Sequence, residues 1–373
     1  MKVAFKPVLA AVSAILLAMM MAGGAFAAES APNDAARFLA GLKPADGTPL
    51  AKRAEEAVWQ RHAKFFDSSW EKLEARQLSK IRTWQGKHLT APQQTLYYMF
   101  SGPDFLYANA FFPKATTYIL SGLEPVGVVP ELSDMPGGTL QSEFRDLQVS
   151  LNSVLNYSFF ITKNMKSQLR SGKVNGTLPV IYVFLARSGK TIDEVSFVEL
   201  DEEGNVGPAP ESGSKSAAKG MKIGFTDAEG KKQTLYYFTT DLSNGGVKKS
   251  GFLKFCEKQA PGHAFIKSAS YLLHSGGFST VRDFLLAKST AILQDDSGIP
   301  VTYFKDEEWD LKPFGRYLGP ISLFRGNYQS KLAKLFKQPS RESIDFGFGY
   351  RWRPNESNIL LSVKKQPKAA SAQ

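Results

Sequence analysis

The sequence has 373 residues, of which 43% are hydrophobic, 12% aromatic and 22% charged, and its formal net charge is +11 at pH 7. This composition is ordinary for a folded globular protein. It excludes a disordered chain, a collagen-like fibre, a disulfide-stapled miniprotein and a protein with many membrane spans. The length exceeds that of a usual domain of roughly 100–200 residues, so it allows one large domain or two interlocked ones.

The first 27 residues have the pattern of an export signal. Lys2 and Lys6 supply positive charge, residues 8–21 form an apolar run of 14 residues, and residues 25–27 read Ala-Phe-Ala, a small-x-small cleavage site. The run is shorter than the ~20 residues that span a bilayer. We therefore expect a cleavable signal peptide with a cut after Ala27, and a soluble bacterial protein that is periplasmic or secreted. No transmembrane segment is expected in the mature chain.

Positive charge is concentrated near the C-terminus. Without Lys2 and Lys6 the chain keeps 44 basic and 35 acidic residues, a net charge of +9. From Leu311 onward it has 12 basic and three acidic residues, also a net charge of +9, so this stretch carries the whole excess. Such an asymmetry is typical either of a surface that binds an anionic partner or of a solubilising surface with a frayed basic tail.

Residues 28–92 are predicted to form an N-terminal helical segment. Apolar and aromatic side chains recur there at steps of three and four, the spacing of one helix face, at Val58, His62, Phe66, Trp70, Leu73, Gln77, Ile81 and Trp84. Residues 67–69, Asp-Ser-Ser, are a candidate break at which a second helix begins. The tryptophans of this segment are interpreted as core residues.

An α+β domain is expected over residues 93–363, because strand and helix spacings alternate there. A glycine-rich stretch, residues 205–220, is expected to be a flexible surface loop, with a linker between domains as the alternative. The predicted strands are 95–100, 117–123, two hairpins (178–186 with 191–200, and 221–227 with 232–241), 298–304, 343–354 and 357–365. The predicted helices are 141–171, 281–293 after a cap at Ser279 and Thr280, and 328–338, while 263–274 is a strand or a buried helix.

These elements together predict an α+β fold. Its sheet is expected to be mostly antiparallel and built from hairpins, with helices packed on it and the N-terminal helical segment in front. Residues 364–373 are expected to form a basic disordered tail.

No catalytic template is complete in the sequence. The nearest indication of catalysis is His274, followed by Ser-Gly-Gly, whose imidazole could act as a base with Asp295 or Asp296 as its orienting carboxylate. The alternative interpretation is that the glycine pair only lets the chain turn before the next helix. An exported hydrolase acting on an ester, a phosphoester or a glycoside is therefore one hypothesis.

Metal and cofactor sites are not predicted. The four histidines share no ligand spacing, and Pro300 stands where a calcium loop starting at Asp295 needs glycine. The single cysteine, Cys256, cannot form a disulfide within the chain.

Ligand-binding candidates lie in three places. Asp104 stands in a Gly-Pro turn, and Asn109 follows it in an aromatic segment that forms either core or the wall of a pocket. Lys248 and Lys249 follow a Gly-Gly pair whose backbone N–H groups could hold an anion, an ordinary turn being the alternative. The basic C-terminal region offers Lys331, Lys334, Arg351 and Arg353.

The leading functional hypothesis is a soluble exported protein that binds an anionic or carbohydrate-like component of the cell envelope without catalysis. Its partner is expected to be an anionic polymer, a glycan or a lipid headgroup surface, and not nucleic acid. The hydrolase that uses His274 is the alternative, and a structural partner within a larger envelope complex is a third hypothesis.

Overall fold

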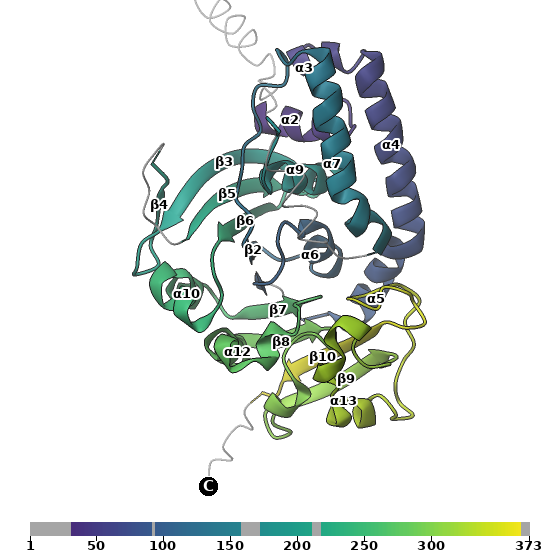
Figure 1. Cartoon of the computed structure of the whole chain (residues 1–373), viewed down its shortest axis with the longest axis vertical. Coiled ribbons are helices and arrows are strands. Elements are labelled where there is room, and N and C mark those ends of the chain that lie inside the picture. Colours follow the sequence, from purple (N-terminus) through teal and green to yellow (C-terminus); the bar gives the residue numbers. More distant parts are fainter. Residues whose placement is uncertain (1–30, 92–93, 158–171, 211–217, 367–373) are drawn as a thin grey trace, which may run out of the picture.

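The computed structural model describes residues 31–91, 94–157, 172–210 and 218–366. The expected export signal, residues 158–171 of the expected helix and residues 367–373 of the expected tail lie outside these ranges. The described residues form an α+β fold around one ten-stranded mixed sheet (Figure 1). Among them, no helix has both the length and the apolar composition needed to cross a membrane.

The strands follow one another in space in the order β4-β3-β5-β6-β2-β1-β7-β8-β10-β9. Their bounds are β1 Thr95–Tyr98, β2 Thr117–Gly122, β3 Thr191–Leu200, β4 Val206–Pro208, β5 Lys219–Thr226, β6 Lys232–Thr239, β7 Gly262–Ile266, β8 Ser289–Gln294, β9 Trp309–Gly315 and β10 Asn358–Lys364. The expected hairpin of residues 221–227 and 232–241 is confirmed as β5 and β6, which pair antiparallel.

The prediction of a mostly antiparallel sheet is wrong. The central strands β6, β2, β1, β7 and β8 are all parallel to their neighbours within that group, and antiparallel pairs occur at the two ends of the sheet. In the centre, Tyr97 of β1 lies between Ile119 of β2 and Ala264 of β7. Parallel neighbours need long crossover connections, so this pairing joins segments far apart in the chain and leaves no local signal in the sequence.

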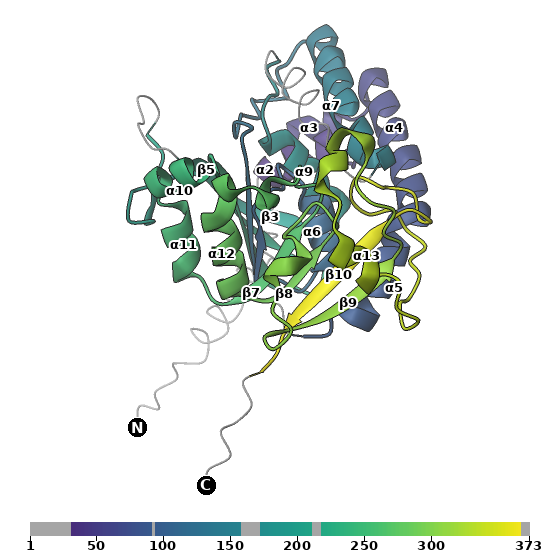
Figure 2. The ribbon, with the colours of Figure 1, turned by 60° about the horizontal axis from the view of Figure 1, so that its bottom comes forward.

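Helices cover both faces of the sheet (Figure 2). Those on one face are α2 Ala31–Leu39, α3 Pro49–Arg53, α4 Ala57–Leu73, α5 Ser79–His88, α6 Phe105–Phe111, α7 Gly137–Tyr157 and α9 Leu178–Arg187. Those on the other face are α10 Asn244–Ser250, α11 Phe252–Lys258 and α12 Ser279–Lys288. A smaller helix, α13 Ser330–Leu335, packs beside β10 through Leu332.

Side chains alternate between the two cores along each central strand, as the pleat requires. Leu96 and Tyr98 of β1 belong to the larger core, whereas Tyr97 belongs to the core beneath α10, α11 and α12. The sheet is therefore buried on both faces, which is the usual situation of parallel strands.

Within the predicted N-terminal helical segment, most of residues 31–88 are helical, with one difference from the prediction. The predicted apolar face is largely buried, with His62, Phe66 and Trp84 among its members. The break expected at residues 67–69 is wrong, because α4 continues to Leu73 and passes through a π-helical turn, Glu74–Leu78, into α5. The helix accommodates an extra residue in that turn without ending.

Several other segments differ from expectation. Residues 178–186 form helix α9 and not a strand, because an apolar run that is buried all round has no readable period. Residues 301–303 form a short 3₁₀ helix. The helix expected over 281–293 ends at Lys288, and the following apolar residues form β8.

Residues 343–354 also differ from the predicted strand, because they form an irregular segment. This segment closes the end of the larger core. Phe346 and Phe348 are buried and contact the ring of Phe111. The side chain of Gln77 accepts a hydrogen bond from the amide of Gly347 (2.6 Å) and donates one to its carbonyl (3.2 Å). This buried amide ties the N-terminal helices to the C-terminal segment.

We expect Gln77→Ala to lower the free energy of unfolding by about 1–3 kcal/mol, because it leaves both backbone groups of Gly347 buried without their partner. Chemical denaturation followed by circular dichroism measures the change. Gln141→Ala, at an exposed site on α7, is the matched control and should shift the midpoint little. Equal effects of the two variants would contradict this role of Gln77.

Candidate ligand-binding site

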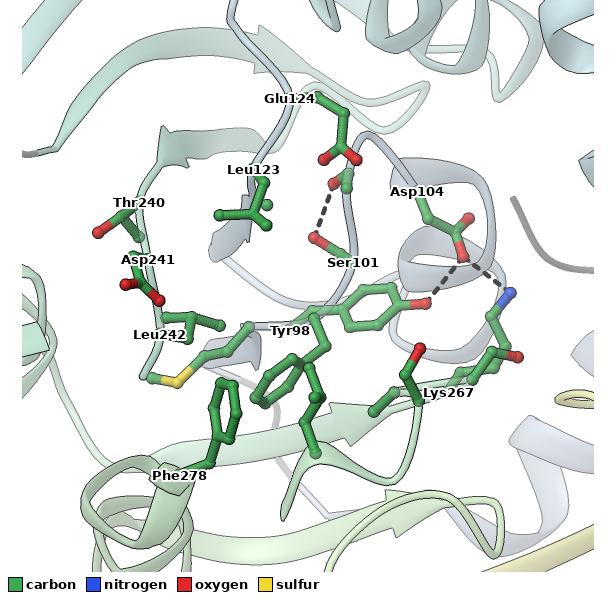
Figure 3. Close-up of a pocket in the computed structure, with 18 residues that line it drawn as sticks. Tyr98, Ser101, Asp104, Leu123, Glu124, Thr240, Asp241, Leu242, Lys267 and Phe278 are labelled. Atoms are coloured by element: carbon green, nitrogen blue, oxygen red, sulfur yellow. Dashed lines mark hydrogen bonds and ion pairs between the residues drawn. The ribbon is translucent and has the colours of Figure 1, made fainter. Parts of the chain in front are cut away.

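A cavity of about 330 Å³ opens at the carboxyl ends of β6, β2, β1 and β7 (Figure 3). Its polar lining includes a lysine, three acidic residues and several hydroxyl groups. The lining residues are Tyr98, Met99, Phe100, Ser101, Gly102, Asp104, Gly122, Leu123, Glu124, Thr240, Asp241, Leu242, Lys267, Ser268, Ala269, Ser270, Leu272 and Phe278.

The topology explains why a cavity forms at this edge. From β1 the chain passes through α6 to β2 and on to β6, and it then returns to the other side of β1 as β7. Loops that leave neighbouring parallel strands in opposite directions separate, and this leaves a crevice at the carboxyl ends of the strands. Ligands of open parallel sheets bind in such crevices.

A buried ion pair forms the floor of the cavity. The ammonium of Lys267, directly after β7, lies 2.9 Å from Oδ2 of Asp104, and the two side chains are 1% and 2% exposed. The same oxygen accepts a hydrogen bond from the hydroxyl of Tyr98 (2.8 Å), and Oδ1 accepts one from the amide of Tyr107 at the start of α6. The ammonium also lies 4.0 Å from the centre of the Tyr107 ring. Asp104 thus joins β1, α6 and β7.

The loop that follows Lys267 has an unusual backbone. Ser268, Ser270 and Tyr271 have φ values of +54°, +52° and +55°, in the left-handed region that side chains other than glycine rarely adopt. Each such residue costs of order 1–3 kcal/mol and persists only where the surroundings hold it in place. Strain of this kind gathers at binding and catalytic sites, and this loop lines the cavity.

Two buried carboxylates behind the cavity hold this loop. Asp295 accepts hydrogen bonds from the amide of Ser268 and from the hydroxyl of Ser297 (2.5 Å), and Asp296 accepts one from the hydroxyl of Tyr271 (2.6 Å). Burial, together with the charge of Asp296, raises the pKa of Asp295 to about 7. Burial also raises the pKa of Asp296 above its ordinary value. Through these hydrogen bonds Asp295 and Asp296 hold the strained loop in place.

The rim of the cavity carries two further carboxylates. Glu124 follows β2 and is 5% exposed, and Asp241 follows β6 and is exposed. Because β2 and β6 are adjacent, with Gly122 opposite Thr239, the two acids leave neighbouring strand ends. Gly122 packs closely against the carboxylate of Glu124, which would have to shift to accommodate a Cβ at that position.

Other hydroxyl groups of the lining are not all satisfied. Among the described residues, Oγ1 of Thr240 and Oγ of Ser268 are buried without a hydrogen-bond partner. The hydroxyl of Ser101 donates to the carbonyl of Gly102 at 2.7 Å. Buried polar atoms normally have partners, so these two hydroxyl groups are available to hydrogen-bond a molecule that enters the cavity.

Apolar side chains form the remaining wall. Phe100 and Phe278 contact each other, with ring centres 6.2 Å apart, and Met99, Leu123 and Leu242 complete this wall. Leu123 is 60% exposed, so part of the wall already faces the solvent. A cavity with one apolar wall and a few convergent polar groups has the make-up of a small-molecule site.

The structure places the predicted catalytic residues together but away from this cavity. The ring of Tyr271 lies between His274 and the carboxylate of Asp296, with ring centres of Tyr271 and His274 5.1 Å apart. The imidazole of His274 hydrogen-bonds the backbone of Asp296 and Gly298, no described hydrogen bond joins it to the carboxylate of Asp295 or Asp296, and burial lowers its pKa. His274 is also absent from the described lining.

The predicted ligand-binding residues are divided. Asp104 lies in the cavity, whereas Asn109 lies farther along α6 and does not belong to the described lining. Lys248 and Lys249 are exposed in the last turn of α10. The Gly-Gly pair before them is helical, and the amide of Gly246 donates to the hydroxyl of Ser243.

The predicted C-terminal basic residues do not face the cavity. Lys331 lies 3.8 Å from Asp306, and Lys334 is exposed. The guanidinium of Arg351 donates to the carbonyls of residues 319 and 320 and lies 3.8 Å from Glu356. Arg353 lies 3.3 Å from the same carboxylate. Several of these cations therefore serve local contacts.

Sequence reasoning missed Lys267, Glu124 and Asp241. Each follows a strand directly or within two residues. That pattern becomes a signal only once β2, β6 and β7 are known to be parallel neighbours, because their carboxyl ends then meet at one edge. The described residues contain no group of three or more His, Cys, Asp or Glu side chains placed to hold a metal ion.

Comparisons with known proteins give no further guide. No family model, no curated protein sequence and no solved structure matches this chain significantly. The site must therefore be interpreted from its own chemistry.

We expect Asp104→Asn to lower the free energy of unfolding by about 3–5 kcal/mol, because it leaves the Lys267 ammonium buried without a countercharge. Denaturant unfolding measures the loss, and the double variant Asp104→Asn/Lys267→Met should recover part of it. The matched control is Glu203→Gln, which breaks an exposed ion pair with Lys254 of the same 2.9 Å length and should cost at most about 1 kcal/mol. If Asp104→Asn and Glu203→Gln lowered the free energy of unfolding equally, the importance assigned to the buried pair would be contradicted.

The raised pKa of Asp295 predicts that stability falls as the pH rises. Between about 4 and about 7 the folded protein retains a proton that the unfolded chain releases, so this residue lowers the free energy of unfolding by up to about 1.4 kcal/mol per pH unit. Above about 7 its contribution is constant. Asp295→Asn should remove this slope in unfolding experiments at a series of pH values.

Subtracting the stability curve of Asp295→Asn from that of the original chain removes the contributions of titratable groups that do not interact with Asp295. His62, whose pKa burial lowers to about 4, contributes a slope of opposite sign in both proteins. Parallel stability curves for the original chain and the variant would contradict the prediction.

Proposed function

We propose that this chain binds a small hydroxyl-rich, carbohydrate-like ligand in the cavity at the carboxyl ends of its parallel strands, and that it does not transform the ligand. The observation that carries the proposal is the buried carboxylate of Glu124 beside an apolar wall. A carboxylate accepts hydrogen bonds from two neighbouring hydroxyl groups, and such charge-assisted bonds are strong. The apolar wall suits the less polar face of a ring.

The charge of the cavity favours an uncharged ligand over an anionic one. Its lining holds three acids, Asp104, Glu124 and Asp241, and one base, Lys267. The ammonium of Lys267 is already paired with Asp104. An anion entering here would lose its hydration and face unpaired negative charge. Of the two ligand classes expected from the sequence, the carbohydrate-like one therefore suits this site.

The lining also supports binding without catalysis. It contains no histidine and no cysteine, and the hydroxyl of Ser101, one of its three serines, donates to a backbone carbonyl instead of to a base. A serine nucleophile requires a base within hydrogen-bond reach. The export signal and the periplasmic or secreted location remain predictions, and with them the ligand would be met in the cell envelope.

We expect Glu124→Gln to weaken ligand binding by at least about tenfold, because a charge-assisted hydrogen bond contributes about 1.5–3 kcal/mol. Isothermal titration of the full chain with D-ribose, D-glucose, D-galactose, N-acetylglucosamine and adenosine would measure this. Glu307→Gln, at an exposed residue outside the lining, is the control and should leave affinity unchanged. The proposal fails if none of these compounds binds, or if the two variants lose affinity equally.

A further inference from the structure

We infer that the ligand of this cavity is a nucleoside that carries no phosphate, with its ribose hydroxyls on Glu124. This inference rests on the function proposed above and narrows it to one substrate class. It depends on where the acids stand in the sheet, on what fills the nearby helix ends, and on the size of the cavity.

The position of Glu124 is that of a ribose-binding acid in a parallel sheet. In parallel sheets that bind dinucleotides at their carboxyl edge, an Asp or Glu about 20 residues beyond the glycine turn after the first strand accepts a hydrogen bond from the ribose 2′-hydroxyl. Here the turn after β1 contains Gly102, which has a φ of +54°, and Glu124 follows it by 22 residues, just beyond β2. The acid is buried and borders the cavity.

The helix ends beside the cavity are not open to a phosphate. The carboxylate of Asp104 already accepts the hydrogen bond of the Tyr107 amide at the start of α6. At the start of α10, the Ser243 hydroxyl accepts the Gly246 amide, and Asp241 accepts the Ser243 amide. A phosphate would therefore meet carboxylates where dinucleotide-binding sheets offer free N–H groups.

The apolar side of the cavity suits the nucleobase of a nucleoside. Leu123, Leu242 and Phe278 offer apolar surface to a flat ring, and Figure 3 shows all three among the side chains that line the cavity. The exposed carboxylate of Asp241 can accept hydrogen bonds from an exocyclic amino group, which a base with such a group would donate. A volume of about 330 Å³ is near the lower end of small-molecule pockets, which suits one nucleoside and not a dinucleotide.

The test is titration calorimetry of the full chain with adenosine, guanosine, cytidine and uridine, each compared with its 5′-monophosphate and with D-ribose. We expect at least one nucleoside to bind at least about tenfold more tightly than its 5′-monophosphate, because the negative charge of the phosphate would face the acids of the lining. Asp241→Asn should reduce the ratio of nucleoside affinity to monophosphate affinity by about threefold, because it removes one negative charge from the lining. Glu307→Gln should leave the ratio unchanged.

Other results separate the two proposals. Binding of ribose or hexoses with no binding of any nucleoside would overturn this inference and leave the carbohydrate-like ligand standing. A monophosphate that binds more tightly than its nucleoside would overturn the exclusion of phosphate. Failure of all sugars and nucleosides to bind would overturn both.

Discussion

The ion pair between Asp104 and Lys267 is the contact on which the candidate site depends. Two opposite charges removed from water persist only when their geometry is good and their remaining hydrogen-bonding positions are filled. Asp104 meets this condition through Tyr98 and the amide of Tyr107, and Lys267 lies over the Tyr107 ring. The pair thereby joins the end of β1, the start of α6 and the end of β7, which together form the floor of the cavity.

Around this floor the molecule concentrates features that lower its stability. The loop of Ser268, Ser270 and Tyr271 has a strained backbone, and the buried carboxylates of Asp295 and Asp296 hold it in place. Both strain and buried charge are costly, and proteins commonly retain them where a site must be rigid before its ligand arrives. They coincide at the edge of the sheet where the cavity opens.

The C-terminal region and the cavity lining have net charges of opposite sign. The sequence from Leu311 onward carries the positive excess, while the cavity lining has three acids and one base. In the described part of the C-terminal region, cations such as Arg351 and Lys331 are engaged with carbonyls or acids nearby. Net charge describes association and solubility, whereas the chemistry of a ligand is decided by the groups that touch it.

The sequence by itself determined the elements that local periodicity can reveal. The helices around His62 and the β5–β6 hairpin follow from spacings of about 3.6 and 2 residues, and a turn at Asp104 follows from its Gly-Pro neighbours. Only the tertiary structure decided that residues 178–186 are helical, because an all-apolar run has no period. It alone also decided that β6, β2, β1 and β7 are neighbours in that order, since pairing across so many residues is settled by packing. This order brings Glu124, Asp241 and Lys267 to one cavity.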